Sequence, residues 1–337
     1  MQFKVLVFNA QDLFLALAHE PRPEDLGRLS DEEWQYFGQG PEKIKPLSKL
    51  HGIARMFAEE DPDLACLCEV GGVLALENLN RLFLGQRYHV FLQAGNSDRG
   101  IENGFLLKKG GAFDGELHSF KEWPVVFHYP HEIDAQTHAI AAAAAPYLDL
   151  GVPHQRRLSR DIPALYLRHD STLRMVVLLA HLKSGLDPHG LDPGGGVRRK
   201  AELEALVAIY RKLSDELKVP VLVGGDFNGK ADRDGFTQEF EALYRETDLD
   251  DALRVAGRDA HERLTHFTFV KDKILTQQFD YLFLPRALQG RIVAEKTYVY
   301  RYRFGTAEGE IMLPFSFRDR NSLPSDHYPL VCVLDLS

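Results

Sequence analysis

The stretch Val219-Pro220-Val221-Leu222-Val223-Gly224-Gly225-Asp226-Phe227-Asn228 joins an apolar run to two polar side chains that are two residues apart. The run Val219 to Val223 predicts a buried strand, and residues i and i+2 of a strand share one face. We therefore expect Asp226 and Asn228 on the same face, where they could hold a water molecule or a phosphate oxygen. The two glycines would let the backbone approach a bound group. Because Gly-Gly-Asp is also ordinary turn chemistry, the significance of this stretch depends on which other residues converge on it.

Other predicted strands also carry a polar residue at one end. Asn9, Glu69 and His181 each follow an apolar run, as Asp226 does. Asp280 and the pair Asp326-His327 instead precede one. If the later strands run antiparallel to the earlier ones, these ends meet at one rim of the fold. The resulting pocket would collect eight polar side chains, namely Asn9, Glu69, His181, Asp226, Asn228, Asp280, Asp326 and His327.

This set of side chains restricts the possible chemistry. Carboxylates and an amide carbonyl are ligands that suit Mg²⁺, and also Mn²⁺. Cysteine ligands are absent from this set, and no closely spaced histidine pair marks a zinc-binding helix. His181 and His327 could donate to a charged oxygen or move a proton. A metal, histidines and a positioned water together favour hydrolysis of a phosphate ester, and no serine elbow, Walker loop or dinucleotide fingerprint competes with this interpretation.

The composition bounds the class of protein. The 337 residues are 45% hydrophobic and 26% charged, as is typical of a globular protein. No apolar stretch reaches membrane-spanning length, and the N-terminus lacks the features of a signal peptide. Cys66, Cys68 and Cys332 lie in apolar runs, which favours reduced core thiols. We therefore expect a cytoplasmic protein without a membrane anchor, and nothing in the sequence indicates a protein partner.

The net charge of −9 argues against a broad basic surface that holds nucleic acid. A nuclease stays possible, since a metal site and a few local Arg and Lys residues can supply the cationic contacts.

Many short strand-like runs and few helical patterns predict an α+β fold of two packed sheets with helices outside. Helical spacing is clear from Ile44 to Phe57, from Val73 to Leu82 and from Leu206 to Leu217. No repeat or linker divides the chain, so residues 1–337 are predicted to form one domain. Irregular insertions are expected at 18–46 and 114–160, each either a connection beside the site or a surface excursion. The strand-like runs are Phe3 to Phe8, Leu64 to Cys68, Tyr88 to Gln93, Phe105 to Leu107, Ala164 to Leu167, Leu173 to Ala180, Val219 to Val223, Phe279 to Leu284, Thr297 to Phe304 and Pro329 to Leu336.

The motifs resemble those of the endonuclease/exonuclease/phosphatase superfamily, which includes DNase I, exonuclease III-like repair nucleases, neutral sphingomyelinases and inositol polyphosphate 5-phosphatases. They occur in the family's order and span nearly the whole chain. The resemblance implies a four-layered α/β/β/α sandwich with two mixed sheets inside. The matching segments are Phe8-Asn9-Ala10-Gln11-Asp12-Leu13-Phe14, Cys68-Glu69-Val70, Arg99-Gly100-Ile101-Glu102-Asn103-Gly104-Phe105, Ala180-His181-Leu182-Lys183-Ser184, Gly225-Asp226-Phe227-Asn228, Phe279-Asp280-Tyr281 and Pro324-Ser325-Asp326-His327-Tyr328-Pro329-Leu330.

The resemblance also implies a metal site and a water-activating group. Glu69 would be the main metal ligand, with Asn9 and Asp326 as further ligands or supporting residues. Asp226 would orient or deprotonate the attacking water, or assist the leaving group, and Asn228 would hold the scissile phosphate. The sequence departs from many family members at Cys68, where they have Gln. Because strand side chains alternate, we expect Cys68 to face away from Glu69 and to alter packing without affecting the metal.

The remaining implied roles concern charge on the phosphate. His327, paired with Asp280, would stabilise the developing negative charge, and His181 would donate to a phosphate oxygen. Arg160 and Lys183 fit either an extra phosphate contact or a solvated basic loop.

The motifs do not identify the substrate, because nucleases, lipid phosphodiesterases and phosphatases share this core chemistry. The leading hypothesis is a Mg²⁺-dependent phosphodiesterase that acts on nucleic acid. The alternatives are a phosphatase or phosphodiesterase for a small-molecule or lipid phosphate, and a catalytically inactive binding protein. Basic residues around the pocket would favour nucleic acid or polyphosphates, whereas an apolar rim would favour lipid.

Overall fold

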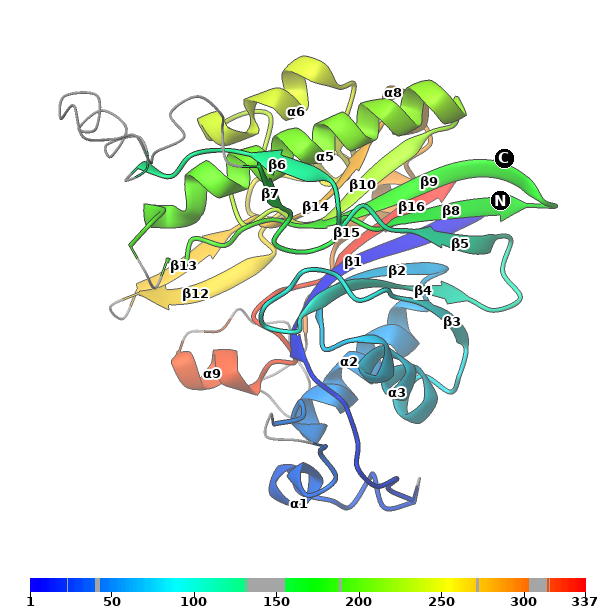
Figure 1. Cartoon of the computed structure of the whole chain (residues 1–337). Helices are drawn as coiled ribbons and strands as arrows, with labels where there is room; N and C mark the ends of the chain where they lie inside the picture. Colours follow the sequence, from blue (N-terminus) through cyan, green and yellow to red (C-terminus); the bar gives the residue numbers. More distant parts are fainter. Residues whose placement is uncertain are drawn as a thin grey trace.

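Two six-stranded β-sheets lie face to face in the centre of the molecule (Figure 1). The computed structural model describes all residues except 23, 40–42, 131, 133–154, 188–189, 271–272, 303–313 and 315. The first sheet contains, in spatial order, β15 (Tyr298–Val299), β16 (Leu330–Asp335), β1 (Gln2–Leu13), β2 (Leu64–Val70), β4 (Glu102–Lys108) and β3 (Tyr88–Phe91). The second contains β11 (Asp250–Asp251), β14 (Asp280–Leu284), β10 (Val221–Asp226), β9 (Thr172–His181), β8 (Ala164–His169) and β5 (Asp114–His118).

Helices cover the outer faces of both sheets, so the molecule has four layers (Figure 1). The first sheet is covered by α2 (Leu47–Glu60) and α3 (Val73–Phe83), and the second by α5 (Gly196–Leu217) and α6 (Glu241–Glu246). This arrangement confirms the predicted α/β/β/α sandwich. Two hairpins lie outside the sheets, formed by β6 (Pro124–Val126) with β7 (Gln155–Arg157) and by β12 (His266–Val270) with β13 (Lys273–Gln277). The shorter helices are α1 (Asp31–Gln35), α7 (Ala252–Val255), α8 (Arg286–Gln289) and α9 (Phe317–Ser322), with 3₁₀ turns at Pro193–Gly195, Gln238–Phe240 and Ala294–Lys296.

The central strands are apolar along their whole length because both of their faces are covered. β10 is buried at every residue, and β2 at all but Glu69. β1 runs parallel to β2, and β9 runs parallel to β10, whereas β16 and β14 are antiparallel to their neighbours β1 and β10. The later strands therefore reverse direction, which confirms the assumption that strand ends and strand starts meet at one rim.

The paired glycines of β10 have a different role from the predicted one. A Cβ on Gly225, whose φ is 138°, would lie 1.8 Å from the carbonyl oxygen of Ala180 on β9. A Cβ on Gly224 would lie 3.2 Å from Val7 of the opposite sheet. The close approach is therefore between strands and between sheets, and the prediction that the glycines admit a bound group is wrong.

Several element boundaries differ from the sequence prediction. Of the strand expected from Thr297 to Phe304, the described residues up to Tyr302 form only β15, and residues 303 and 304 lie outside the described part of the chain. Helix α5 begins ten residues earlier than the helical spacing indicates, at Gly196. The 114–160 segment is not irregular throughout, because β5 pairs with β8 and thereby completes the second sheet. Its residues 133–154 lie outside the described part of the chain. Among the described residues, no helix is both long and apolar enough to cross a membrane.

Candidate active site

Residues from both sheets meet at the rim where the parallel strands end. Asn9 on β1 and Glu69 on β2 come from the first sheet, and three side chains come from the second. The strand register places Asp226 on β10 between His181 on β9 and Asp280 on β14. The structure thus brings together the residues that the sequence selects, whereas their catalytic roles stay predictions.

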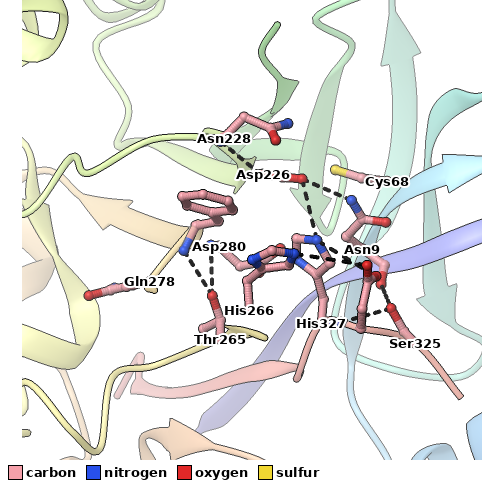
Figure 2. A network of polar contacts seen from close by, with 12 residues as sticks. Asn9, Cys68, Asp226, Asn228, Thr265, His266, Gln278, Asp280, Ser325 and His327 are labelled. Atoms are coloured by element: carbon pink, nitrogen blue, oxygen red, sulfur yellow. Dashed lines mark hydrogen bonds and ion pairs between the residues drawn. The ribbon is translucent and has the colours of Figure 1, made fainter. Parts of the chain in front are cut away.

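Asp226 lies at the centre of this arrangement (Figure 2). Its Oδ2 accepts a hydrogen bond from Asn9 Nδ2 at 2.8 Å, and its Oδ1 accepts one from the backbone N–H of Asn228 at 2.8 Å. The Nε2 atoms of His181 and His327 lie 3.7 and 3.9 Å from Oδ2. Burial raises the pKa of Asp226 to about 7. A carboxylate with this pKa can take up and release a proton near neutral pH.

His327 is held by a buried carboxylate. Its Nδ1 donates to Asp280 Oδ2 at 2.7 Å, and Asp280 is itself fixed because the backbone N–H groups of Asp280 and Phe279 both donate to Thr265 Oγ1 at 3.0 Å. Burial alone would lower the pKa of His327, but Asp280 and the neighbouring carboxylates outweigh it and raise this pKa to about 10. The ring is therefore a cation at neutral pH, with Nε2 turned towards Asp226.

Glu69 sits on strained backbone. Its φ is 60°, and Gln11 and Asp12 on β1 have φ of 45° and 50°, values that non-glycine residues rarely adopt. The turn at Gln11 and Asp12 places the N–H of Asp12 3.0 Å from Glu69 Oε2, while Asn9 Nδ2 donates to Glu69 Oε1 at 3.2 Å. Such strain persists where the surrounding structure holds it, and it is often found at functional sites.

Asn9 is oriented by the same turn. Its Oδ1 accepts from the backbone N–H of Gln11 at 2.9 Å, so the amide NH₂ and not the carbonyl faces Glu69 and Asp226. Of the two roles predicted for Asn9, this geometry fits a residue that supports the carboxylates rather than a direct metal ligand.

Cys68 lies in the space between the two sheets, next to Asp226 (Figure 2). Its thiol is 3.6 Å from the carbonyl oxygen of Ala180, and burial raises its pKa well above the ordinary value. The expected alternation with Glu69 does not hold in regular form, because the strand register shifts between Leu67 and Val70 and Glu69 is left-handed. Cys68 packs as a neutral core thiol, as predicted, and its lack of influence on a metal stays a prediction.

His181 is an almost completely buried, neutral imidazole. Burial, together with the charges of Arg160, His327 and Arg99, holds its pKa well below the ordinary value. Its Nε2 lies 3.8 Å from Glu69 Oε1, and its Nδ1 has no hydrogen-bond partner in the described part of the chain.

Glu69, His181, Asp226 and His327 line a cavity of about 490 Å³. Arg160 lines it, as the phosphate-binding prediction requires, and so does Asn228, whose Nδ2 donates to the carbonyl of Leu182 at 3.1 Å. Lys183 does not line it, because its Nζ donates to the carbonyls of Ser184 and Leu186. The phosphate contact predicted for Lys183 therefore needs the side chain to turn away from its own loop.

Four basic residues of the cavity carry no predicted role in the sequence analysis, namely Arg99, Arg199, Arg320 and His266. Arg99 pairs with Asp12 at 2.7 Å, and Arg320 on α9 pairs with Asp326. His266 on β12 stacks on Phe279 with ring centroids 4.8 Å apart. Arg99 lies within a matched motif and could have been noted there. Arg320 and His266 belong to no motif, and only the tertiary fold brings them to the cavity.

The donor set fits a hard cation. Glu69, Asp226 and Asp326 present carboxylate oxygens to the cavity, and Mg²⁺ and Mn²⁺ prefer such ligands. Burial would raise the pKa of Asp326, but His327, His266 and Arg320 lower it, so this carboxylate stays ionised. Within the described residues, two groups of three possible ligand atoms lie within 4.8 Å of one another, namely Asp226 with Asp280 and His327, and His266 with Asp326 and His327. Glu69 belongs to neither group, and its role as the main ligand stays a prediction.

Among known proteins, only solved structures show similarity to this chain. No family model matches the sequence, and no curated protein does either. A truncated TDP2 from Caenorhabditis elegans is 17% identical, with a TM-score of 0.57 over 99% of this chain and 97% of its own. The mannosyl-6-phosphatase of Bacteroides thetaiotaomicron is 13% identical, with a TM-score of 0.58 over 99% and 100%. The human Nocturnin catalytic domain, with a bound sulfate anion, is 15% identical, with a TM-score of 0.56 over 100% and 95%.

At such low identities these similarities establish the fold and leave the activity to be argued from the site. A further structure of the same fold is described as an endonuclease/exonuclease/phosphatase family protein from Bacteroides thetaiotaomicron, with 14% identity and a TM-score of 0.53. The paired six-stranded sheets, their helical layers and these neighbours together show that the chain has the DNase I-like fold of the endonuclease/exonuclease/phosphatase superfamily.

Proposed function

We propose that this protein is a Mg²⁺-dependent phosphodiesterase that hydrolyses nucleic acid. The observation that carries the proposal is the continuous network in which Asp280 holds His327 and Asn9 joins Glu69 to Asp226, beneath an arginine-lined cavity. Bound Mg²⁺ would supply Lewis-acid stabilisation of a phosphate oxygen, with Glu69 and Asp326 as its carboxylate ligands and Asn9 as their support.

In the proposed mechanism, each of these residues has a separate role at the phosphate. Asp226 takes a proton from the attacking water, since its raised pKa makes it a better base than an ordinary carboxylate. The charged His327 donates from Nε2 to a phosphate oxygen as negative charge develops there. His181, Asn228 and Arg160 bind and orient the remaining phosphate oxygens. As the new P–O bond forms, the bond to the leaving group breaks, and the leaving oxygen takes up a proton from solvent water.

Nucleic acid is favoured by the charge of the cavity walls. Arg99, Arg160, Arg199 and Arg320 line it, and guanidinium groups suit phosphate oxygens. The fold is compatible with such a substrate, because a TDP2 from D. rerio with this fold has been solved with a single-strand DNA product, at 15% identity and a TM-score of 0.52. The catalytically inactive alternative is disfavoured by the intact hydrogen-bonded network.

A phosphatase or phosphodiesterase for a small-molecule or lipid phosphate is the second candidate. It is favoured by an apolar group at the cavity, because Leu186 lines it and is 73% exposed. The mannosyl-6-phosphatase shows that the fold also occurs in enzymes named for small phosphorylated molecules.

The test is a panel of single-stranded DNA, duplex DNA, RNA, a phosphorylated sugar and a phospholipid, each assayed with Mg²⁺, Mn²⁺ or EDTA. We expect Mg²⁺-dependent cleavage of nucleic acid, with kcat lowered about 10²- to 10⁴-fold in Asp226→Asn and in His327→Ala. Asp114→Asn and His89→Ala, at exposed positions, serve as matched controls. Hydrolysis of the sugar or lipid phosphate alone would support the second candidate. Full activity in Asp226→Asn or His327→Ala would refute the role proposed for the substituted residue.

A further inference from the structure

Lys45 reaches the site from the segment 18–46, whose role the sequence leaves open. It precedes Pro46, which caps the N-terminus of α2. The residue is 4% exposed, and its Nζ donates to the backbone carbonyl of Gln11 at 2.7 Å. Gln11 belongs to the left-handed turn of β1 that orients Asn9 and Glu69, so the ammonium group contacts the back of the proposed metal site.

The charges that Lys45 meets are those of the site. Asp326, Asp12 and Glu69 act to raise its pKa, but burial outweighs them and lowers it to about 7, with a further lowering by Lys49. Among the described residues, no carboxylate oxygen lies within 4.0 Å of the ammonium. Lys45 therefore faces the carboxylates across a gap and forms no direct ion pair with them.

Stability alone does not explain a lysine at this position. The backbone of Lys45 is held independently of its side chain, because its N–H donates to Phe14 and its carbonyl accepts from Trp34 Nε1 at 2.9 Å. A buried ammonium with one hydrogen bond and no close counter-ion costs free energy, whereas methionine would fill the same space without a charge. A costly charged group beside a functional site indicates a functional role.

Lys49, which also does not line the cavity, interacts electrostatically with Asp326. The two arginines that pair directly with these carboxylates lie on the substrate side. Arg99 pairs with Asp12 and Arg320 pairs with Asp326, and both arginines line the cavity. An incoming phosphate can draw these guanidinium groups away, because they suit phosphate as well as carboxylate. Lys45 does not line the cavity, so its side chain is not placed to leave the carboxylates for an incoming phosphate.

We propose that Lys45 is a built-in counter-cation of the Glu69, Asp12 and Asp326 carboxylates, which weakens divalent-cation binding at this cluster. The inference rests on the proposed metal role of Glu69. Its physical basis is repulsion between like charges, which is strong where water is excluded.

The test measures Mn²⁺ binding by electron paramagnetic resonance and by equilibrium dialysis, at about pH 6 so that Lys45 is protonated. We expect wild type to bind one ion per chain and Lys45→Met to bind it at least about tenfold more tightly. Lys45→Gln, which keeps a donor for Gln11, should behave in the same way. Lys43→Met removes an exposed lysine two residues away and should leave the affinity unchanged.

The direction of the change in Mn²⁺ affinity decides between the possible outcomes. Unchanged or weaker Mn²⁺ binding in folded Lys45→Met or Lys45→Gln overturns the proposal, and so does loss of the fold in both variants, since it would show a structural role. Glu69→Gln tests the underlying metal site separately. If that variant still binds Mn²⁺ like wild type, the proposed metal site fails, and the inference about Lys45 fails with it.

Discussion

The Asp280 carboxylate sets the charge of His327, because it is buried, fixed by Thr265 and 2.7 Å from the ring. The folded protein holds this proton up to about pH 10, whereas an unfolded histidine releases it near 6.5. The resulting stabilisation is fully present below about pH 6.5 and is lost as the pH rises towards 10.

We therefore expect Asp280→Asn to lower the pKa of His327 and to flatten the decline of stability between about pH 6.5 and 10. Urea unfolding at pH 6 and pH 9, in EDTA, would measure the free energy of unfolding, and NMR titration of the imidazole would report the pKa directly. Asp114→Asn is the exposed control. An unchanged imidazole pKa in Asp280→Asn would show that another group holds the proton.

Helix α5 carries a buried carboxylate, Glu202, that holds two loops beside the cavity. Glu202 Oε1 accepts from the N–H of Ser159 at 3.0 Å, and its Oε2 accepts from the N–H of Lys183 at 2.9 Å. The first bond fixes the loop that carries Arg160, and the second fixes the loop that follows His181. Glu202 is thus a positioning residue, because it acts on the phosphate through these neighbours.

Glu202→Gln keeps the shape of the side chain but replaces one acceptor oxygen with a donor, so one of the two loops is released. We expect KM to rise about tenfold with a smaller change in kcat, because the phosphate contact proposed for Arg160 would contribute to substrate binding. Glu204→Gln, on the exposed face of the same helix, should have no effect. If Arg160→Ala and Glu202→Gln act through one contact, the double variant should be no worse than Arg160→Ala; additive losses would contradict this link.

Sequence patterns predict the strands and the residues of the rim well because burial on both faces leaves an unbroken apolar run before each polar residue. β10 with Asp226 and β9 with His181 are examples. The patterns do not reveal β5, which is a half-exposed edge strand without an apolar run. The patterns also give no role to Lys45, His266 and Arg320, because only tertiary packing brings these residues to the site. A lone charged or aromatic residue carries no local sequence signal of such a position.

Regular alternation also fails where the backbone is irregular. The sequence pattern assumes that Cys68 and Glu69 face opposite sides, but a register shift and a left-handed φ at Glu69 remove the basis for that rule.

At the scale of the whole molecule, the site is assembled from both sheets. Asn9 of the first sheet bonds Asp226 of the second, and His327, which precedes β16 of the first sheet, bonds Asp280 of the second. Contacts across the sheet interface therefore fix the distances between catalytic groups.

A substitution at Gly224 would test whether the spacing of the two sheets controls activity. A Cβ at this position would lie 3.2 Å from Val7 of the opposite sheet. We expect Gly224→Ala to move the sheets slightly apart, with a loss of roughly 1–3 kcal/mol in stability and at least about a 100-fold loss in kcat/KM. Urea unfolding and steady-state kinetics on the same preparation would compare the two losses, with Gly27→Ala, where a Cβ meets nothing within 4 Å, as control. An activity loss no larger than that of an equally destabilised core variant would contradict the link.

The order of the strands has a consequence for the protein during its synthesis. β16 pairs with β1, so His327 and Asp326 come from a segment made more than 300 residues after Asn9. A nascent chain on the ribosome consequently lacks its cationic histidine until more than 300 residues beyond Asn9 have been made. We therefore expect the proposed phosphodiesterase activity to be absent up to that point of synthesis, while the chain is still attached to the RNA-rich machinery that makes it.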